Sequence, residues 1–285
     1  MKVLVTGSSG FVGRWLVPEL VGAGHDVACD PPGSRIDVTE WPALWAWFET
    51  VRPDAVIHLA AVASGHDVEA DPGRAMTIAA TGTANVAAAL ARAAGRGSAA
   101  PVLLVAGSGE VYGAVTAADL PVSEDQLPRP RTLYGVTKLA QEAVALSVGA
   151  RAGLRVVVAR SFNHTGPGQS PTYAVAAFAE RVLAAREAGT RTIAVGRIDV
   201  RRDLTDVRDV VVAYRRLLEV AAEDPVAGAV VVNVGSGASV LLRDVVQRLA
   251  QLADFVVDPI VDPLLVRSNE SPEVRADVRQ LTNLT

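Results

Sequence analysis

A glycine-rich segment that follows directly on the first apolar run narrows the possible folds of this chain more than any other feature. The run Val3-Leu4-Val5 is typical of a buried strand, and it leads into Gly7-Ser8-Ser9-Gly10-Phe11-Val12-Gly13. Glycines at these places allow a tight turn, let the backbone approach a ligand, and let the following helix pack closely on the strand. The start of that helix adds free N–H groups and a partial positive charge. We therefore expect a strand–turn–helix unit that binds a dinucleotide through its pyrophosphate.

Short β-branched runs alternate with Ala- and Leu-rich stretches through the first two-thirds of the sequence. We predict strands at 3–5, 27–29, 55–57, 102–105 and 156–158, and helices near 12–23, 39–50, 72–94 and 134–151. Because the strand runs are almost entirely apolar, both faces of the sheet should be buried beneath helices. The pattern predicts an α/β protein with a Rossmann-type, doubly wound parallel sheet.

The alternation loosens after residue 160, where a Gly/Pro-rich loop is followed by a helix near 174–188 and a short strand near 192–195. We predict a dinucleotide-binding domain at 1–160, to which 206–236 returns, and a smaller C-terminal substrate-binding lobe from 161–205 and 237–285. The chain has 285 residues, half of them apolar, which is enough for two unequal parts that share a cleft.

Composition limits the partners and the compartment. The net charge is −4 and a fifth of the residues are charged, so no global field would draw the protein to nucleic acid or to an anionic membrane. A single cysteine, Cys29, excludes an internal disulfide and favours a reducing compartment. No apolar run is long enough to span a bilayer, and the chain enters a strand at once. We expect a cytoplasmic protein with no nucleic-acid or membrane partner and, with four histidines, no metal.

Two segments after the glycine turn are predicted to hold the adenosine part of a dinucleotide. The second strand ends near Asp30, about 20 residues beyond the glycines, where a carboxylate accepts hydrogen bonds from the ribose and repels a 2′-phosphate. Arg35 in the next loop could pair with that phosphate, so NAD and NADP both stay open, and Asp30 could also be an ordinary turn residue. Asp37 and Val38 are candidates for the adenine pocket. The competing interpretation is that Thr39 caps a helix there.

A tyrosine and a lysine are spaced to share one helix face. Tyr134 and Lys138 stand four residues apart, and on a helix their side chains project about one turn from each other. A positive charge beside a phenol lowers its pKa, which would make Tyr134 a usable proton donor or acceptor. The competing interpretation is an exposed helix pair. Ser108 lies just beyond the fourth strand, where ligands bind in open α/β sheets, and its hydroxyl could hold a carbonyl oxygen near the tyrosine.

The glycine turn, the Ser108 segment and Tyr134-Gly135-Val136-Thr137-Lys138 resemble the extended short-chain dehydrogenases/reductases in order and spacing, and the resemblance covers essentially the whole chain. It implies that Ser108 and Tyr134 bind the reacting oxygen, that Tyr134 exchanges the proton, and that Lys138 also holds the nicotinamide ribose of NAD or NADP. The turn after His58 resembles the family's cofactor-lining turn. The expected cofactor-binding residues are Gly7, Ser9, Gly10, Phe11, Val12, Gly13, Asp30, Arg35, Asp37, Val38, Leu59, Ala60, Ala61, Tyr134, Lys138 and Ser161.

Two later segments resemble one branch of that family, the GDP-mannose 4,6-dehydratases and GDP-4-keto-6-deoxymannose reductases. In the first, residues 160–169, Asn163 corresponds to an asparagine that approaches the nucleotide-sugar. In the second, residues 201–209, Arg202 corresponds to an arginine that contacts the substrate diphosphate, a role that suits the planar fork of a guanidinium. The competing interpretation for such an arginine is a surface ion pair.

Further residues complete the substrate side by the same resemblance. Arg267 is a second arginine of this kind, and Glu270 is a candidate partner for a nucleoside hydroxyl. The expected substrate-binding residues are Ser64, Ser108, Asn163, Arg202, Arg267 and Glu270.

The type of reaction rests on smaller features. The segment Lys138-Leu139-Ala140-Gln141-Glu142 and the compact length resemble the reductases, whereas Glu110 stands where the dehydratases carry the glutamate that removes the C5 proton. We expect NAD(P)H-dependent reduction of the C4 ketone of a nucleotide-linked 4-keto-6-deoxyhexose. The alternatives are a nucleotide-sugar 4,6-dehydratase or 4-epimerase, and a non-enzymatic dinucleotide-sensing regulator; such regulators usually lack the tyrosine–lysine pair.

Three positions depart from the pattern of the family. Ala79 stands where relatives usually have asparagine, Ser161 replaces the usual proline beside the nicotinamide, and Arg197 replaces a common asparagine near the nucleotide base. The last change keeps a dTDP-linked sugar open as the substrate. The resemblance also implies a homodimer, in which helices near 72–94 and 134–151 pair with their copies.

Overall fold

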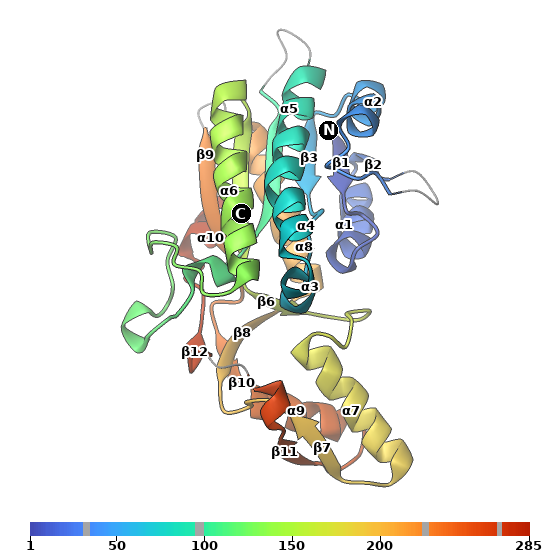
Figure 1. Ribbon diagram of the computed structural model, residues 1–285, viewed down its shortest axis with the longest axis vertical. Helices are drawn as coiled ribbons and strands as arrows, with labels where there is room; N and C mark the ends of the chain where they lie inside the picture. The colour runs from blue at the N-terminus through green and yellow to red at the C-terminus, as the bar shows by residue number, and fades with distance from the viewer. Residues whose placement is uncertain (31–34, 95–99, 224–227, 267–269) are drawn as a thin grey trace.

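The structure, a computed structural model, describes residues 1–30, 35–94, 100–223, 228–266 and 270–285. Its centre is a six-stranded parallel sheet with the order β2-β1-β3-β4-β5-β9 (Figure 1). These strands are β1 (Lys2–Thr6), β2 (Asp26–Ala28), β3 (Ala55–His58), β4 (Val102–Ser108), β5 (Arg155–Ser161) and β9 (Ala229–Val234). The predicted Rossmann-type sheet is confirmed, including the return of the chain to it at β9.

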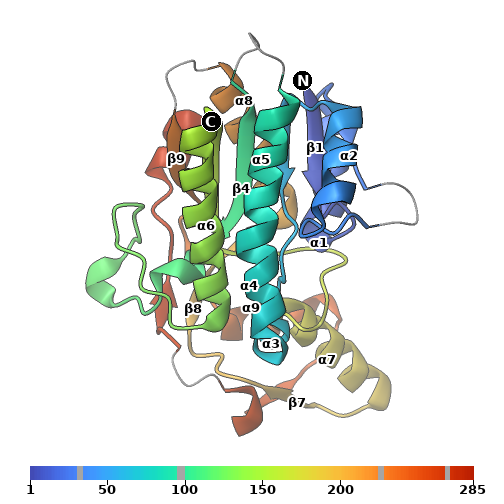
Figure 2. The same cartoon turned by 45° about the horizontal axis from the view of Figure 1, so that its top comes forward.

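Helices cover both faces of this sheet. On one face α1 (Phe11–Gly22) packs against α8 (Val207–Glu223), and on the other lie α2 (Trp41–Val51), α5 (Thr83–Ala93) and α6 (Leu133–Ala152). Both views show α5 and α6 side by side in front of the sheet (Figures 1 and 2). Alternate residues of β1 serve the two cores, because Val3 and Val5 pack under α1 and α8 whereas Leu4 packs on the other side. Burial of both faces explains the unbroken apolar runs.

The helix predicted near 72–94 contains a π turn. After α3 (Gly65–Ala70) comes α4 (Pro72–Thr77), then a π-helical turn, η1 (Ile78–Gly82), and then α5. The turn passes Val38 so closely that a Cβ on Gly82 would lie 2.5 Å from a methyl carbon of that residue. The predicted helix is confirmed as one run of contiguous helical turns that contains a π turn, and single π turns of this kind frequently occur near functional sites.

A smaller lobe lies below the sheet in Figure 1. Its helices α7 (Ala174–Ala188) and α9 (Leu242–Leu252) pack on the two-stranded parallel sheet of β7 (Thr192–Val195) and β11 (Asp258–Val261), around a core that includes Phe178 and Val246. A second sheet joins β8 (Arg201–Asp206) to β6 (Asn163–Thr165), β10 (Ser239–Leu241) and β12 (Glu273–Val274). Short 3-10 helices occur at η2 (Gly109–Tyr112), η3 (Ala117–Asp119) and η4 (Pro263–Leu265).

The last helix, α10 (Arg279–Leu284), lies against α8 and β9. Leu281 and Leu284 pack on the core between the large sheet and α8. Here the structure differs from the expectation that 237–285 belongs entirely to the smaller lobe, because these two leucines find their apolar partners on the larger part.

Within the described ranges, no helix combines the length and apolar content needed to cross a membrane. In the same ranges, no three side chains of His, Cys, Asp or Glu gather as a possible metal site.

Candidate active site

The glycine turn has the geometry of a phosphate-binding loop. Gly7 adopts a φ of +71°, and a Cβ there would lie 2.8 Å from the backbone nitrogen of Ala60. A Cβ on Gly13 would lie 2.4 Å from the carbonyl oxygen of Ser8. Gly10 caps α1, and no side chain of the described residues caps that helix end. The first-turn N–H groups therefore remain available to a phosphate, so these residues fit the pyrophosphate of a dinucleotide.

A buried histidine shapes the opposite side of this loop. His58 Nδ1 lies 2.8 Å from Thr6 Oγ1, and Nε2 lies 3.0 Å from Thr83 Oγ1 on α5. Thr6 Oγ1 also accepts a hydrogen bond of 3.3 Å from the backbone N–H of Ala60. Burial, and then the charge of Lys138, lowers the pKa of His58 to about 3. A neutral His58 thus fixes the turn Leu59-Ala60-Ala61 beside the glycines.

Asp30 stands where the ribose of a dinucleotide is expected. Burial raises the pKa of its carboxyl, while hydrogen bonds from the Ile36 backbone and the Ser8 side chain, and the charge of Arg35, oppose that rise. The carboxylate that would repel a 2′-phosphate and the guanidinium that would attract one therefore lie at the same end of the site.

The segment at Asp37 and Val38 is fixed locally. The Asp37 carboxylate accepts hydrogen bonds from the backbone N–H (2.9 Å) and hydroxyl (2.7 Å) of Thr39. Val38 is buried, and its carbonyl accepts a hydrogen bond of 3.1 Å from Asn85 Nδ2 on α5. Since Glu40 occupies the N-cap of α2, the competing interpretation that Thr39 caps this helix is wrong.

The predicted catalytic residues come together where β4 ends and α6 begins. The Ser108 hydroxyl lies near enough to the phenol of Tyr134 to act on its pKa, and Lys138 Nζ lies 6.0 Å from the centre of the Tyr134 ring. Thr132 caps α6 and donates a hydrogen bond of 2.9 Å to Glu110 Oε2. These contacts bring the first turns of α6 and its cap, Thr132, against the end of β4.

Gly135 allows this approach. A Cβ at position 135 would lie 2.9 Å from the Glu110 carbonyl oxygen and equally close to Pro130 Cβ. The residue after the tyrosine must therefore lack a side chain, because α6 otherwise could not begin so near the strand end.

Burial controls the pKa values at this site. It raises the pKa of Tyr134, the charge of Glu110 raises it further, and the hydrogen bond from Ser108 opposes both. The prediction that Lys138 lowers this pKa is wrong, because burial dominates and the ammonium is engaged elsewhere, with Ala106 O (2.8 Å) and Gln141 Oε1 (3.0 Å). Tyr134 is protonated at neutral pH, the state of a proton donor. Burial also lowers the pKa of Lys138 to about 8.

Sequence reasoning missed a buried network that fixes α6. Arg160 on β5 forms an ion pair with Glu142 on α6, in which Nε donates to Oε2 at 3.0 Å and Nη2 donates to Oε1. Arg160 Nη1 donates to the hydroxyl of Tyr112 (3.0 Å), which donates to Asn233 Oδ1 on β9 (2.7 Å). The network sets the position of α6 relative to β5, β9 and the 3-10 helix η2. Its signal was a glutamate four residues beyond Lys138, the spacing that keeps both on one helix face.

Ser161 pairs in register with Ser108, at the end of the neighbouring strand. Its hydroxyl lies 2.6 Å from the hydroxyl of the buried Tyr214 on α8. The side chain expected beside the nicotinamide is therefore engaged inside the core. Burial raises the pKa of Tyr214 to about 12, although the hydrogen bond with Ser161 opposes the rise.

The expected substrate residues differ in how free their side chains are. Asn163 is exposed at the start of β6. The Ser64 hydroxyl is engaged with Asp67, since it accepts from the backbone N–H (3.1 Å) and donates to Oδ2 (2.7 Å) at the start of α3. Arg197 is exposed, and Arg267 lies outside the described residues.

Arg202 and Glu270, two expected substrate residues, contact each other. Arg202 Nη2 lies 2.8 Å from Glu270 Oε1, and Nη1 donates to the carbonyl of Ser271 at 3.0 Å. The side chains are 11% and 18% exposed, so this ion pair is largely buried rather than on the surface. The ion pair fixes the position of the Arg202 guanidinium on β8, and β8 pairs with β6, the strand of Asn163.

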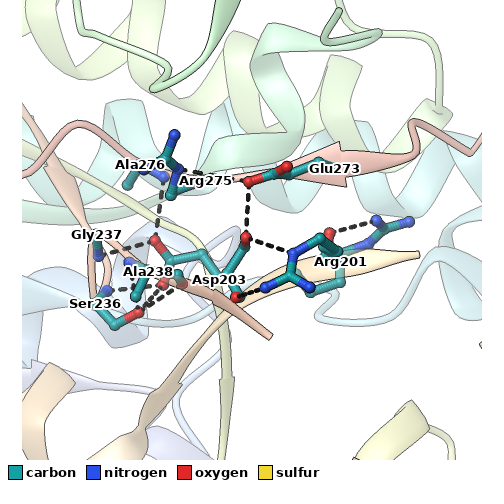
Figure 3. Close-up of polar contacts among 10 residues, drawn as sticks. Arg201, Asp203, Ser236, Gly237, Ala238, Glu273, Arg275 and Ala276 are labelled. Carbon is teal, nitrogen blue, oxygen red and sulfur yellow. Dashed lines mark hydrogen bonds and ion pairs between the residues drawn. The ribbon is translucent and has the colours of Figure 1, made fainter. Parts of the chain in front are cut away.

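A buried carboxylate next to Arg202 holds β8 in place (Figure 3). Asp203 accepts hydrogen bonds from the backbone N–H (2.8 Å) and hydroxyl (2.6 Å) of Ser236, and from the backbone N–H groups of Gly237 (3.1 Å) and Ala276 (3.1 Å). Charge-assisted bonds of this kind are the stronger ones in proteins. They tie β8 both to the turn that follows β9 and to the segment that follows β12.

Comparison with known proteins agrees with this geometry. The family described as NAD dependent epimerase/dehydratase matches residues 3–235. The chain is 38% identical to a GDP-6-deoxy-D-mannose reductase of Pseudomonas aeruginosa, over 100% of this chain and 90% of that protein. It is 31% identical to a UDP-glucose 4-epimerase of Mycolicibacterium smegmatis, over 92% of this chain and 86% of that protein. Among solved structures, RMD from Pseudomonas aeruginosa complexed with NADPH matches with a TM-score of 0.88 and 38% identity, covering 100% of this chain and 92% of that chain. The fold, the glycine turn and these likenesses together show that the chain belongs to the NAD dependent epimerase/dehydratase family.

Proposed function

We propose that this protein, an NAD(P)-dependent oxidoreductase, reduces the C4 ketone of a nucleotide-linked 4-keto-6-deoxyhexose, with the GDP-linked sugar as the first candidate. The observation that carries the proposal is the meeting of Ser108, at the end of β4, with Tyr134 in the first turn of α6 and with Lys138 one turn further along that helix. Likeness over the whole chain to a relative named GDP-6-deoxy-D-mannose reductase supports both the ketone and the base. The intact Ser108, Tyr134 and Lys138 disfavour a non-enzymatic regulator.

The proposed cofactor site runs along the carboxyl ends of β1 to β5. The N-terminus of α1 and the Gly7-to-Gly13 turn would hold the pyrophosphate, Asp30 and Arg35 would meet the adenosine ribose, and Lys138 would meet the nicotinamide ribose. When bound, the reduced nicotinamide supplies the hydride.

Side chains of the protein supply the proton to the ketone oxygen and stabilise the negative charge that develops during reduction. Tyr134 donates its phenolic proton to the ketone oxygen, because burial keeps the phenol protonated until that oxygen becomes basic. The Ser108 hydroxyl holds the same oxygen, and Ser108 and the ammonium of Lys138 would stabilise the negative charge that grows on it during reduction. Such preorganised groups commonly lower a barrier by about 2 to 4 kcal/mol each.

Arg202 is the proposed anchor for the diphosphate of the substrate, and Arg267 and Asn163 keep their predicted roles in binding it. Because Arg202 is paired with Glu270 in the structure, binding would exchange one anionic partner of the guanidinium for another. Glu270 would then be released to accept a hydrogen bond from a nucleoside hydroxyl, its predicted role.

Glu110 favours a second candidate function, the nucleotide-sugar 4,6-dehydratase. Its charge acts on Tyr134, so a carboxylate would be near a substrate that reacts at this tyrosine, as removal of the C5 proton would require. The side chain is tethered by Thr132, however, and the likeness to a reductase makes reduction the first choice. A 4-epimerase is the third, by likeness to the Mycolicibacterium smegmatis relative.

The test is turnover by the purified protein. It is incubated with GDP-4-keto-6-deoxymannose and either NADPH or NADH, while the absorbance of the reduced cofactor and the chromatographic profile of the products are followed. Stoichiometric oxidation of cofactor with formation of a GDP-6-deoxyhexose is expected. Conversion of GDP-mannose without net use of cofactor would instead establish the dehydratase. Turnover only of a dTDP-linked ketosugar would show that the substrate carries thymine rather than guanine.

The proposal includes a homodimer formed through α5 and α6. These helices lie side by side on one face of the molecule (Figure 2), and small residues on them, such as Ala88 and Ala143, would allow close packing with a second copy. Sedimentation of the native protein tests this expectation. Location in the cytoplasm remains a prediction from the sequence.

A further inference from the structure

Gln141 is a buried amide on the helix face that carries the catalytic residues. It follows Lys138 by three positions on α6, so its side chain projects from the same side of the helix as Tyr134 and Lys138. Its exposure is 0%. A primary amide is costly to bury unless its hydrogen bonds are made, so its presence here calls for a specific partner.

That partner is the ammonium of Lys138. Gln141 Oε1 accepts a hydrogen bond of 3.0 Å from Lys138 Nζ, and the carbonyl oxygen of Ala106 on β4 accepts another of 2.8 Å. Among the described residues, these two acceptors take two of the three N–H donors of the lysine. Since the four-carbon stem of a lysine is otherwise flexible, two fixed acceptors set the direction of the third N–H.

The orientation of the amide supports a dedicated role. Oε1 faces the ammonium because Nε2, itself a donor, would be repelled by it. Nε2 then lies buried without an acceptor in the described part of the chain. An unsatisfied buried Nε2 destabilises the fold, so the contact that Oε1 makes with Lys138 best explains why an amide stands here.

We propose that Gln141 is a positioning residue, which holds the Lys138 ammonium so that one N–H points to the nicotinamide ribose of the cofactor. The inference rests on the proposed NAD(P) function of the site but does not depend on which sugar is reduced. Gln141 touches neither the cofactor nor the reacting atoms; it acts through the lysine.

A pH-dependent readout separates positioning from mere packing. Besides Tyr134 on its own helix, the titratable groups that face Lys138 are His58 on β3 and His164 on β6, and in both histidines burial and the lysine charge lower the pKa. Both histidines are therefore neutral at pH 7, and neither is expected to lose a proton as the pH rises further. Loss of the Lys138 proton is the expected titration in that range, and an acceptor at Gln141 favours the charged form.

The experiment measures the dissociation constant of NADPH, by fluorescence, from pH 6 to 10 for the full chain and three variants. Gln141→Met keeps the length of the side chain without the acceptor, Gln141→Glu keeps an acceptor, and Gln251→Met on the exposed face of α9 is the control for a distant glutamine. Circular dichroism and thermal unfolding verify folding. The measurement needs no sugar, so an incorrect sugar assignment would not affect it.

We expect Gln141→Met to weaken NADPH binding about 10-fold at pH 7, since a hydrogen bond to a charged group is lost, and to move the loss of affinity at high pH to a lower pH. Gln141→Glu should bind within about threefold of the native protein and move that loss to a higher pH. An unchanged affinity and an unchanged pH midpoint in Gln141→Met would overturn the proposal. If that variant does not fold, a midpoint in Gln141→Glu that fails to rise would overturn it equally.

Discussion

The catalytic face of α6 and the substrate strand β8 hold their charged groups in different ways. On α6, Lys138 and Glu142 are buried and bonded to groups of the central sheet, Ala106 and Arg160. On β8, Asp203 is anchored by four donors, whereas its neighbour Arg202 is paired with Glu270, from a segment outside any strand. The contrast suggests that the groups for chemistry are fixed before substrate arrives, whereas the group for binding exchanges a partner when it does.

The largest effect on catalysis is expected at the catalytic face of α6, whose groups are fixed by the central sheet. Tyr134→Phe removes the proton donor with little change in shape, so kcat should fall by about 10³- to 10⁴-fold, while NADPH affinity stays within about threefold. Steady-state kinetics and fluorescence titration measure the two quantities. Retention of more than a tenth of the native kcat would show that another group donates the proton.

The second largest effect is expected on the free energy of unfolding, when the buried ion pair of Arg160 and Glu142 is broken. Arg160→Met leaves Glu142 as an unpaired buried carboxylate, which we expect to lower the free energy of unfolding by about 3 kcal/mol. The double variant Arg160→Met with Glu142→Met removes both charges and should regain most of that loss. Urea unfolding of both proteins measures it; an equal loss in the two would mean that the pairing does not matter.

Substitution of Arg202 on β8, which is expected to exchange its partner, should change substrate affinity alone. Arg202→Met removes the proposed diphosphate anchor, so KM for the nucleotide-sugar should rise by about 10- to 100-fold, the value of one or two charge-assisted hydrogen bonds, with kcat within about threefold. Glu270→Gln is the matched control, because it weakens the competing ion pair and should raise KM far less. A large fall in kcat with unchanged KM in Arg202→Met would place that residue with the fixed groups instead.

The pH dependence of the native enzyme separates the two sides further. Burial lowers the pKa of Lys138 from its ordinary value near 10.5 to about 8, so the protonated form is complete below that pH and is lost above it. We therefore expect kcat/KM to fall about 10-fold per pH unit as the pH rises well above 8, where each unit removes most of the remaining cation. A rate that stays constant to pH 10 would contradict a role for the lysine charge.

The smallest effect is expected at Glu110. If the enzyme is a reductase, Glu110→Gln should reduce kcat less than about tenfold, because the carboxylate acts on Tyr134 only through its charge. A dehydratase would lose its base and fall by about 10²-fold or more. Kinetics with the ketosugar measure the first effect, and kinetics with GDP-mannose measure the second.

Most of the fold was predictable because both faces of the central sheet are buried, which leaves unbroken apolar runs in the sequence. Two features were not. The π turn at Ile78–Gly82 interrupts an Ala-rich helix, and a locally widened turn barely changes the spacing of such small side chains. The return of α10 depends on Leu281 and Leu284, too few residues for a periodic pattern.

The candidate site was predictable where its residues are close in sequence. The spacing of Tyr134 and Lys138 places them on one helix face, and Ser108 closes the strand that the apolar run predicted. The contacts of Arg160 with Glu142 and of Asp203 with Ala276 join positions that only folding brings together. The pKa of Tyr134 was predicted in the wrong direction, because a sequence shows the neighbouring lysine but not the depth of burial.

The central claim, reduction at C4, is tested most directly by isotope transfer. The enzyme is incubated with GDP-4-keto-6-deoxymannose and NADPH carrying deuterium at the transferable position of the nicotinamide, and the product is examined by NMR and mass spectrometry. We expect one deuterium at C4 of the sugar for each cofactor oxidised, with none at C6. A product without deuterium at C4, or no oxidation of NADPH or of similarly labelled NADH, would contradict it.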